Sequence, residues 1–160
     1  MSALSWNCRG LGNLQTVRSL QEVIASEDPI LVFLMETKLS KEEMTKKKYT
    51  LGVIEGLIVA SNGSKGGLAL LWKKEIMVDV QTFGLWHIDA KVGRADGSRK
   101  WRFTRFYGQP DTSKREETWQ ILERLGTSNS FPWLCIGDFN KIVSNVEKLR
   151  GNLRAPKQME

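Results

Sequence analysis

Cysteine and histidine are scarce in this sequence: its 160 residues include two cysteines and one histidine. The cysteines, Cys8 and Cys135, lie in separate apolar segments, and no second cluster of metal-ligating residues accompanies either of them. A disulfide framework or a cysteine-bound metal is therefore disfavoured. We expect two reduced thiols in the core of a nuclear or cytoplasmic protein.

Long apolar runs are missing as well. No segment approaches the roughly 20 apolar residues that a membrane-spanning helix needs, and the start, MSALSWNCRG, has no basic leader before an apolar block. We therefore expect no signal peptide and no membrane partner. The net charge of +6 favours a polyanionic partner instead. Repeats and linkers are absent too, so we assign residues 1–145 to one domain and 146–160 to a polar, basic tail that packs poorly.

The apolar patterns predict helices interspersed with strands and a strand-rich middle. Strands are expected at residues 4–8, 30–35, 56–61, 67–72, 76–83, 85–92, 100–107 and 133–136. Helices are expected after capping residues: Asn13, Ser40 with Glu43, and Ser113 with Glu116. Residues 62–66, NGSKG, have hairpin chemistry, so the middle strands are predicted to be antiparallel. We interpret the six tryptophans as packing residues.

Polar side chains stand at the ends of four of these strands. Asn7 and Glu36 end the first two, Tyr107 ends the strand at 100–107, and Asp138 and Asn140 follow the buried segment WLCI. Strand ends that meet at one edge of a sheet bring distant residues together, so these side chains are expected to form one site. In an extended backbone, Asp138 and Asn140 would also point to the same side.

The residue types at these positions suit phosphate and metal chemistry. Glu36 is a natural ligand for a hard cation such as Mg²⁺, which keeps most of its waters and needs only one or two carboxylates from the protein. Asn7 and Tyr107 could hold phosphate oxygens. Asp138 could deprotonate an attacking water that Asn140 orients.

Each of these residues also has a simpler interpretation. Asn7 could form a turn, Glu36 could be an ordinary exposed acid, and Tyr107 could be a core tyrosine. Asp138 and Asn140 could close a strand with an Asx turn. The single histidine, His87, is predicted to lie in the middle of the strand at 85–92, so we assign it no catalytic role.

Five segments occur in the order and approximate spacing of the endonuclease/exonuclease/phosphatase superfamily: SWNCRGLG, LMETKL, GGLALLW, FYGQP and WLCIGDFN. The chain most resembles the apurinic/apyrimidinic-like endonuclease domain of plant LINE-type (non-LTR) retrotransposon reverse transcriptase polyproteins. The resemblance implies a DNase I-like, four-layer α/β sandwich in which helices flank two mainly antiparallel sheets. It also implies cleavage of DNA phosphodiester bonds with Mg²⁺ or Mn²⁺ and no small-molecule cofactor.

The resemblance gives each strand-end residue a role. Asn7 matches an asparagine at the metal and phosphate, and Glu36 matches the metal-binding glutamate. Tyr107 matches a phosphate-contacting tyrosine. Asp138 matches the aspartate that activates water, and Asn140 matches the asparagine beside it.

Two arginines and the end of the chain depart from the superfamily's pattern. Arg9 stands where many relatives carry an acid, and Arg105 shares a strand face with Tyr107. Both are candidate phosphate contacts, although Arg105 could instead disturb packing. The superfamily's terminal motif, with its catalytic histidine, is not found before Glu160.

We therefore expect weak or no activity from this chain alone, and name the missing part of the domain as a further candidate partner. The alternatives are a non-catalytic nucleic-acid-binding remnant and a phosphoesterase acting on a small phosphoester.

Overall fold

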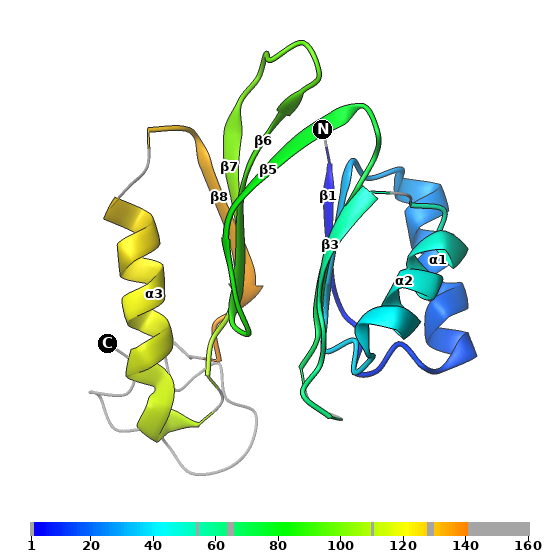
Figure 1. Ribbon diagram of the computed structural model, residues 1–160, viewed down its shortest axis with the longest axis horizontal. Helices are drawn as coiled ribbons and strands as arrows, with labels where there is room; N and C mark the ends of the chain where they lie inside the picture. The colour runs from blue at the N-terminus through cyan, green and yellow to red at the C-terminus, as the bar shows by residue number, and fades with distance from the viewer. Residues whose placement is uncertain (1, 54, 64–65, 110, 128–129, 141–160) are drawn as a thin grey trace, which may run out of the picture.

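The computed structural model describes residues 2–53, 55–63, 66–109, 111–127 and 130–140. They form two four-stranded sheets, ordered β1-β2-β4-β3 and β5-β6-β7-β8. The strands are β1 Ala3–Asn7, β2 Leu31–Met35, β3 Glu55–Val59, β4 Leu68–Trp72, β5 Ile76–Phe83, β6 His87–Arg94, β7 Trp101–Tyr107 and β8 Trp133–Asp138. The helices are α1 Leu14–Glu27, α2 Lys41–Thr50, the short 3₁₀ helix η1 Thr112–Lys114 and α3 Arg115–Thr127. In Figure 1, α1 and α2 cover one sheet and α3 covers the other, so the expected four-layer sandwich is confirmed.

Each sheet contains one parallel pair of strands, β1 with β2 and β7 with β8. The other pairs are antiparallel, as expected for the middle of the chain. The parallel pairs matter for function because parallel neighbours end at the same edge of a sheet. Asn7 lies opposite Met35, the residue before Glu36, and Tyr107 lies opposite Asp138.

Strand β2 is the centre of the core, and all five of its residues are buried. Its unbroken apolar sequence is typical of a strand covered on both faces. Val32 and Leu34 pack toward the helices, while Phe33 and Met35 pack toward the second sheet. The two apolar layers of the sandwich therefore meet on this strand, and its end is held firmly in place.

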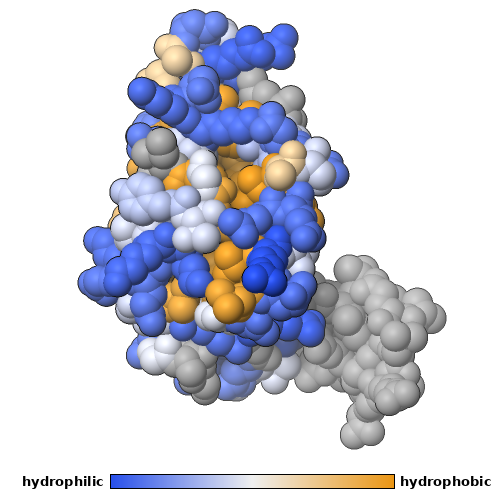
Figure 2. All heavy atoms as spheres, turned by 90° about the vertical axis from the view of Figure 1, so that its right-hand side faces the viewer, coloured by the Kyte–Doolittle hydropathy of each residue, from blue (hydrophilic) through white to orange (hydrophobic). Residues whose placement is uncertain are grey.

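The helices over the first sheet begin as their capping residues predict. The Asn13 side chain accepts a hydrogen bond from the Gln15 N–H at 2.8 Å, and Ser40 and Glu43 form a reciprocal capping box. Figure 2 faces these helices and shows hydrophilic residues over most of their outer side, with apolar residues visible between them. This pattern is typical of amphipathic helices that bury one face.

The third helix begins differently from the prediction. Asp111, and not Ser113, supplies the cap: its carboxylate accepts the Ser113 N–H at 3.0 Å and starts the η1 turn. Glu116 falls in the first turn of α3, beyond η1. The Asx turn at Asp111 forms in place of the predicted capping box, because Asp111 lies two residues earlier and its carboxylate already accepts the free N–H of Ser113.

Two strand predictions need correction. The predicted strand at 85–92 begins at His87, because the Gly84 N–H donates to the His87 carbonyl at 2.9 Å and closes a turn through Leu85 and Trp86. The segment before Asp138 is not wholly buried either, since Leu134 is 41% exposed. In the described part of the chain β8 pairs only with β7, which leaves its other edge open.

The cysteines are free thiols at separate places in the fold. Burial raises the pKa of Cys8 to about 12 and the pKa of Cys135 to about 11, so both thiols are protonated at neutral pH. No helix among the described residues is long and apolar enough to cross a membrane. The tail assigned to residues 146–160 lies outside the described residues.

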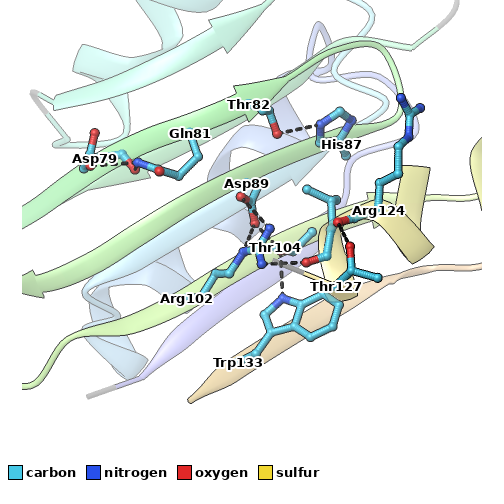
Figure 3. A network of polar contacts seen from close by, with 11 residues as sticks. Asp79, Gln81, Thr82, His87, Asp89, Arg102, Thr104, Arg124, Thr127 and Trp133 are labelled. Atoms are coloured by element: carbon cyan, nitrogen blue, oxygen red, sulfur yellow. Dashed lines mark hydrogen bonds and ion pairs between the residues drawn. The ribbon is translucent and has the colours of Figure 1, made fainter. Parts of the chain in front are cut away.

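A buried polar network fastens α3 to the second sheet (Figure 3). Arg102 donates to both carboxylate oxygens of Asp89, at 2.8 and 3.1 Å, and to the Leu125 carbonyl at 2.6 Å. The Thr104 hydroxyl donates to Asp89 and accepts the Trp133 indole N–H. Because Asp89 is 1% exposed and Arg102 5% exposed, each depends on the other for compensation of its charge.

We predict that Asp89→Ala lowers the free energy of unfolding by about 3–5 kcal/mol, because it leaves the Arg102 guanidinium buried without its carboxylate. Urea unfolding followed by circular dichroism measures the loss. Asp79→Ala is the matched control: Asp79 is exposed on β5, where its carboxylate accepts a bond from Gln81 at 2.7 Å. The control is expected to change stability by less than about 0.5 kcal/mol. Equal losses in the two variants would contradict this account.

Candidate active site

One carboxylate oxygen forms the meeting point of the predicted site. Oε1 of Glu36 accepts the amide N–H of Asn7 at 3.3 Å and the hydroxyl of Tyr107 at 3.1 Å. Asn7 ends β1 and Glu36 directly follows β2, both of the first sheet, and Tyr107 ends β7 of the second. Three of the residues proposed from strand ends therefore lie together, at one end of the gap between the sheets.

The backbone of Glu36 is held in the left-handed region, with φ at 51°. Its carbonyl accepts the Gly10 N–H at 2.8 Å, and the next residue, Thr37, donates its N–H to Gly67 at 3.2 Å. A Cβ at Gly67 would overlap the Thr37 hydroxyl, so this contact requires glycine. The neighbouring loops thus impose a strained backbone on Glu36, as is common at functional sites.

Asn7 forms the turn that its simpler interpretation allowed and also contacts Glu36. Its side-chain oxygen accepts the Arg9 N–H at 3.1 Å, which makes an Asx turn, and its amide nitrogen is thereby directed at Glu36. Arg9 itself is exposed and adopts a left-handed φ of 47°. Its side chain is therefore open to solvent in the loop that follows Asn7.

Tyr107 is half-buried, and its hydroxyl reaches the site. Its ring stacks on Trp86, with centroids 6.0 Å apart and planes 5° from parallel, and its N–H donates to the Trp86 carbonyl at 2.7 Å. Burial, followed by the negative charge of Glu36, raises the pKa of Tyr107. At neutral pH the hydroxyl is therefore a hydrogen-bond donor.

Asp138 and Asn140 lie beside Tyr107, but not through an extended backbone. Asn140 has a left-handed φ of 50°, and its N–H donates to the Asp138 carboxylate at 3.0 Å in an Asx turn. The Asn140 amide donates to the Gly108 carbonyl at 2.6 Å, which ties the ends of β7 and β8 together. Asp138 is exposed at this edge, so its second oxygen can reach a ligand.

Arg105 lies beneath the site and does not line it. It is 0% exposed, its Nη1 donates to the carbonyls of Phe106 and Ile136 at 2.6 and 2.9 Å, and its Nη2 contacts the Met35 sulfur. Burial lowers its pKa to about 10, against the opposing effect of Asp138, so it stays charged. In this arrangement its guanidinium cannot touch a phosphate in solvent, so the expected phosphate contact of Arg105 is wrong.

His87 points away from the site. Its Nε2 is 3.0 Å from the Thr82 hydroxyl across the β5–β6 hairpin (Figure 3). Burial, together with the positive charge of Arg124, lowers its pKa, and Asp89 opposes this shift. A neutral imidazole in the hairpin fits the structural role expected of it.

A cleft of about 610 Å³ opens beside Glu36 and Tyr107. Sequence reasoning missed most of its lining. Leu85 and Trp86 were assigned to a strand, and Lys38, Asn62 and Gln109 stand in loops without periodicity. The only available signal was the position of these residues next to glycines and strand ends, which is weak without the fold.

The residues present fit a lightly ligated Mg²⁺ or Mn²⁺. Among the described residues no three acidic, histidine or cysteine side chains gather as metal ligands. Magnesium needs only one or two protein carboxylates and keeps several waters. Glu36 is partly exposed and its hydrogen-bond partners, Asn7 and Tyr107, are uncharged, so its negative charge remains available to a cation.

Comparison with models of known protein families shows to which family the chain belongs. The model of the Endonuclease/Exonuclease/phosphatase family matches residues 4–154. The chain belongs to this family. Its motifs at Asn7, Glu36, Tyr107 and Asp138 all fall inside the matched region. Known members of the family are hydrolases that include nucleases and phosphatases. No curated protein sequence matches the chain.

Solved structures share the fold at low sequence identity. The human Nocturnin catalytic domain with bound sulfate is 14% identical, with a TM-score of 0.61, over 86% of this chain and 63% of that one. The Neisseria 3′ phosphatase NExo bound to a product DNA hairpin is 15% identical, with a TM-score of 0.65, over 91% and 60%. The mannosyl-6-phosphatase of Bacteroides thetaiotaomicron is 14% identical, with a TM-score of 0.61, over 88% and 65%. The chain thus spans less than two thirds of each of these proteins.

We predict that Gly137→Ala disturbs the end of β8 and lowers stability by about 1–3 kcal/mol. An added Cβ would overlap the Phe106 carbonyl and lie 2.6 Å from Arg105 Nη1, and neither group can move without breaking other contacts. Gly12→Ala is the matched control, because no atom lies within 4 Å of its added Cβ.

Chemical unfolding of the two variants measures the difference. Hydrogen exchange at the backbone N–H of Asn140, which donates to the Asp138 carboxylate, is expected to accelerate in Gly137→Ala. Unchanged stability and exchange in Gly137→Ala would show that the strand end is loosely packed.

Proposed function

We propose that this domain hydrolyses phosphodiester bonds of DNA with a divalent metal, as an endonuclease-like enzyme, and that this chain alone does so weakly, because its single histidine lies away from the site. The observation that carries the proposal is the shared contact of Asn7 and Tyr107 with Glu36, beside an exposed Asp138. It combines a carboxylate for a cation, donors for phosphate oxygens and a second carboxylate for water in one place. Water is the nucleophile, so no covalent enzyme intermediate is expected.

The residues take separate roles in this proposal. Glu36 and Asn7 would hold Mg²⁺ or Mn²⁺, which supplies charge stabilisation to the phosphoryl group and lowers the pKa of bound water. In the complex with substrate, the single hydroxyl proton of Tyr107 would turn from Glu36 to a phosphate oxygen, and Arg9 would approach from the loop after β1. Asp138 accepts the proton of the attacking water, and Asn140 holds that carboxylate through its backbone N–H.

DNA is favoured over a small phosphoester by charge and by the sequence motifs. The net charge of +6 suits a polyanion whose phosphates continue beyond the site. The five ordered motifs support a relationship to the endonuclease domain of plant LINE-type retrotransposons. A neighbour of the same fold was solved with a DNA hairpin, which agrees with this substrate class.

We predict that Glu36→Ala and Asp138→Ala each reduce Mg²⁺-dependent nicking of supercoiled plasmid by about 100-fold or more, since each removes a group that acts at the reacting phosphate. The assay is run with Mg²⁺, Mn²⁺ or chelator. Glu22→Ala, an exposed acid on α1, is the matched control and is expected to nick at the parental rate.

Three other outcomes would reject this proposal. Nicking that survives Glu36→Ala would place the chemistry elsewhere. Salt-sensitive DNA binding by a folded protein that never nicks would support the non-catalytic binding module instead. Faster hydrolysis of a small phosphate ester than of DNA, lost in the same variants, would support the phosphoesterase alternative.

A further inference from the structure

The cleft beside Glu36 is larger than a phosphate and a metal ion require. Its volume of about 610 Å³ lies in the range of pockets that enclose whole small molecules. It extends from Glu36 and Tyr107 between the ends of the two sheets. The additional space therefore adjoins the reacting phosphate and belongs to whatever group is attached to it.

The two walls of the cleft are apolar. Met35, Val59 and Leu68 line it from the first sheet, and Leu85 and Trp86 line it from the β5–β6 turn. Leu85 is 59% exposed, so its apolar side chain is open to a ligand in the cleft. A flat apolar group bound between the two walls would bury the apolar side chains of both walls.

The Trp86 wall is fixed to the phosphate-binding side chain. Trp86 stacks on Tyr107, and its carbonyl accepts the Tyr107 N–H at 2.7 Å. The Tyr107 hydroxyl in turn donates to Glu36 at 3.1 Å. A ligand on the Trp86 side of the cleft is therefore held at a defined position relative to the phosphate.

The rim of the cleft is polar, with one positive charge from Lys38 and one negative charge from Asp111. Asn62 and Gln109 each offer an amide donor and an amide acceptor, and Lys38 is exposed beside them. Nucleobases combine apolar faces with an edge of alternating donors and acceptors. A sugar offers a small C–H patch bordered by hydroxyls and not two wide apolar faces, and an acyl chain has no use for the amides.

We propose that this cleft binds one unpaired base of the DNA strand, on the nucleotide whose phosphate lies at Glu36 and Tyr107. The inference rests on the proposed function and specifies its substrate class: DNA with an unpaired nucleotide at the cleavage position. A base inside an intact duplex is stacked and paired, so it cannot enter the cleft unless it is first turned out of the helix.

The test compares binding of two DNA hairpins that carry one bulged nucleotide, either thymidine or a tetrahydrofuran residue that lacks the base. Fluorescence anisotropy measures both dissociation constants in Ca²⁺, with a gel to verify that the DNA stays intact. We expect the thymidine bulge to bind about tenfold more tightly, from stacking of one base. Leu85→Ala is expected to lose most of this preference. Leu14→Ala removes a leucine that is 68% exposed on α1, outside the cleft, and is expected to keep it.

Equal binding of the two hairpins would overturn the base site, as would a preference that Leu85→Ala leaves intact. Plasmid nicking by the same preparations separates this result from the proposed function. A base preference without nicking supports the base site and rejects hydrolysis. Nicking without a base preference supports hydrolysis and rejects the base site.

Discussion

The contact of Glu36 with Asn7 and Tyr107 is the interaction on which the site depends. It joins the ends of three strands, and its members come from both sheets. Hydrogen bonds to a charged group are worth about 1.5–3 kcal/mol each, so they help to hold the sheet ends in register. Both donors are uncharged and therefore leave the carboxylate with its full negative charge. The same contact that positions the sheets thus keeps a charge available for a cation.

The parallel strand pairs explain why these residues meet where they do. Asn7 with Glu36, and Tyr107 with Asp138, stand at the ends of neighbouring parallel strands, after which the chain must turn sharply. Arg9, Glu36, Lys38 and Asn140 all adopt left-handed backbone conformations there. Such conformations cost of order 1 kcal/mol or more each, and the bonds between loops, such as Gly10 to Glu36, offset the cost. The edge that carries the candidate site is therefore strained but well defined.

Sequence alone predicted the parts of this arrangement that local chemistry controls. The unbroken apolar run of β2, the capping box at Ser40 and the residues at the strand ends all follow from side-chain type and spacing. The turn at Leu85 and Trp86 did not, because an alternating apolar pattern continues through a turn that only the Gly84–His87 hydrogen bond reveals. The Asx turn from Asp138 to Asn140 was one of the two local interpretations of these residues, and the structure has this turn. The burial of Arg105 depends on contacts with residues distant in sequence, which have no local signal.

Arg105 shows how the fold arranges charge around the site. Its guanidinium is buried next to Met35 and Ile136, one layer below the edge that carries Glu36 and Asp138. Burying an arginine without a bonded carboxylate is costly, and its attraction to Asp138 returns part of that cost. Because Arg105 is fully buried, its guanidinium adds no positive charge to the surface beside Glu36. Placing the arginine inside instead of at the surface thus leaves the Glu36 carboxylate open to a cation.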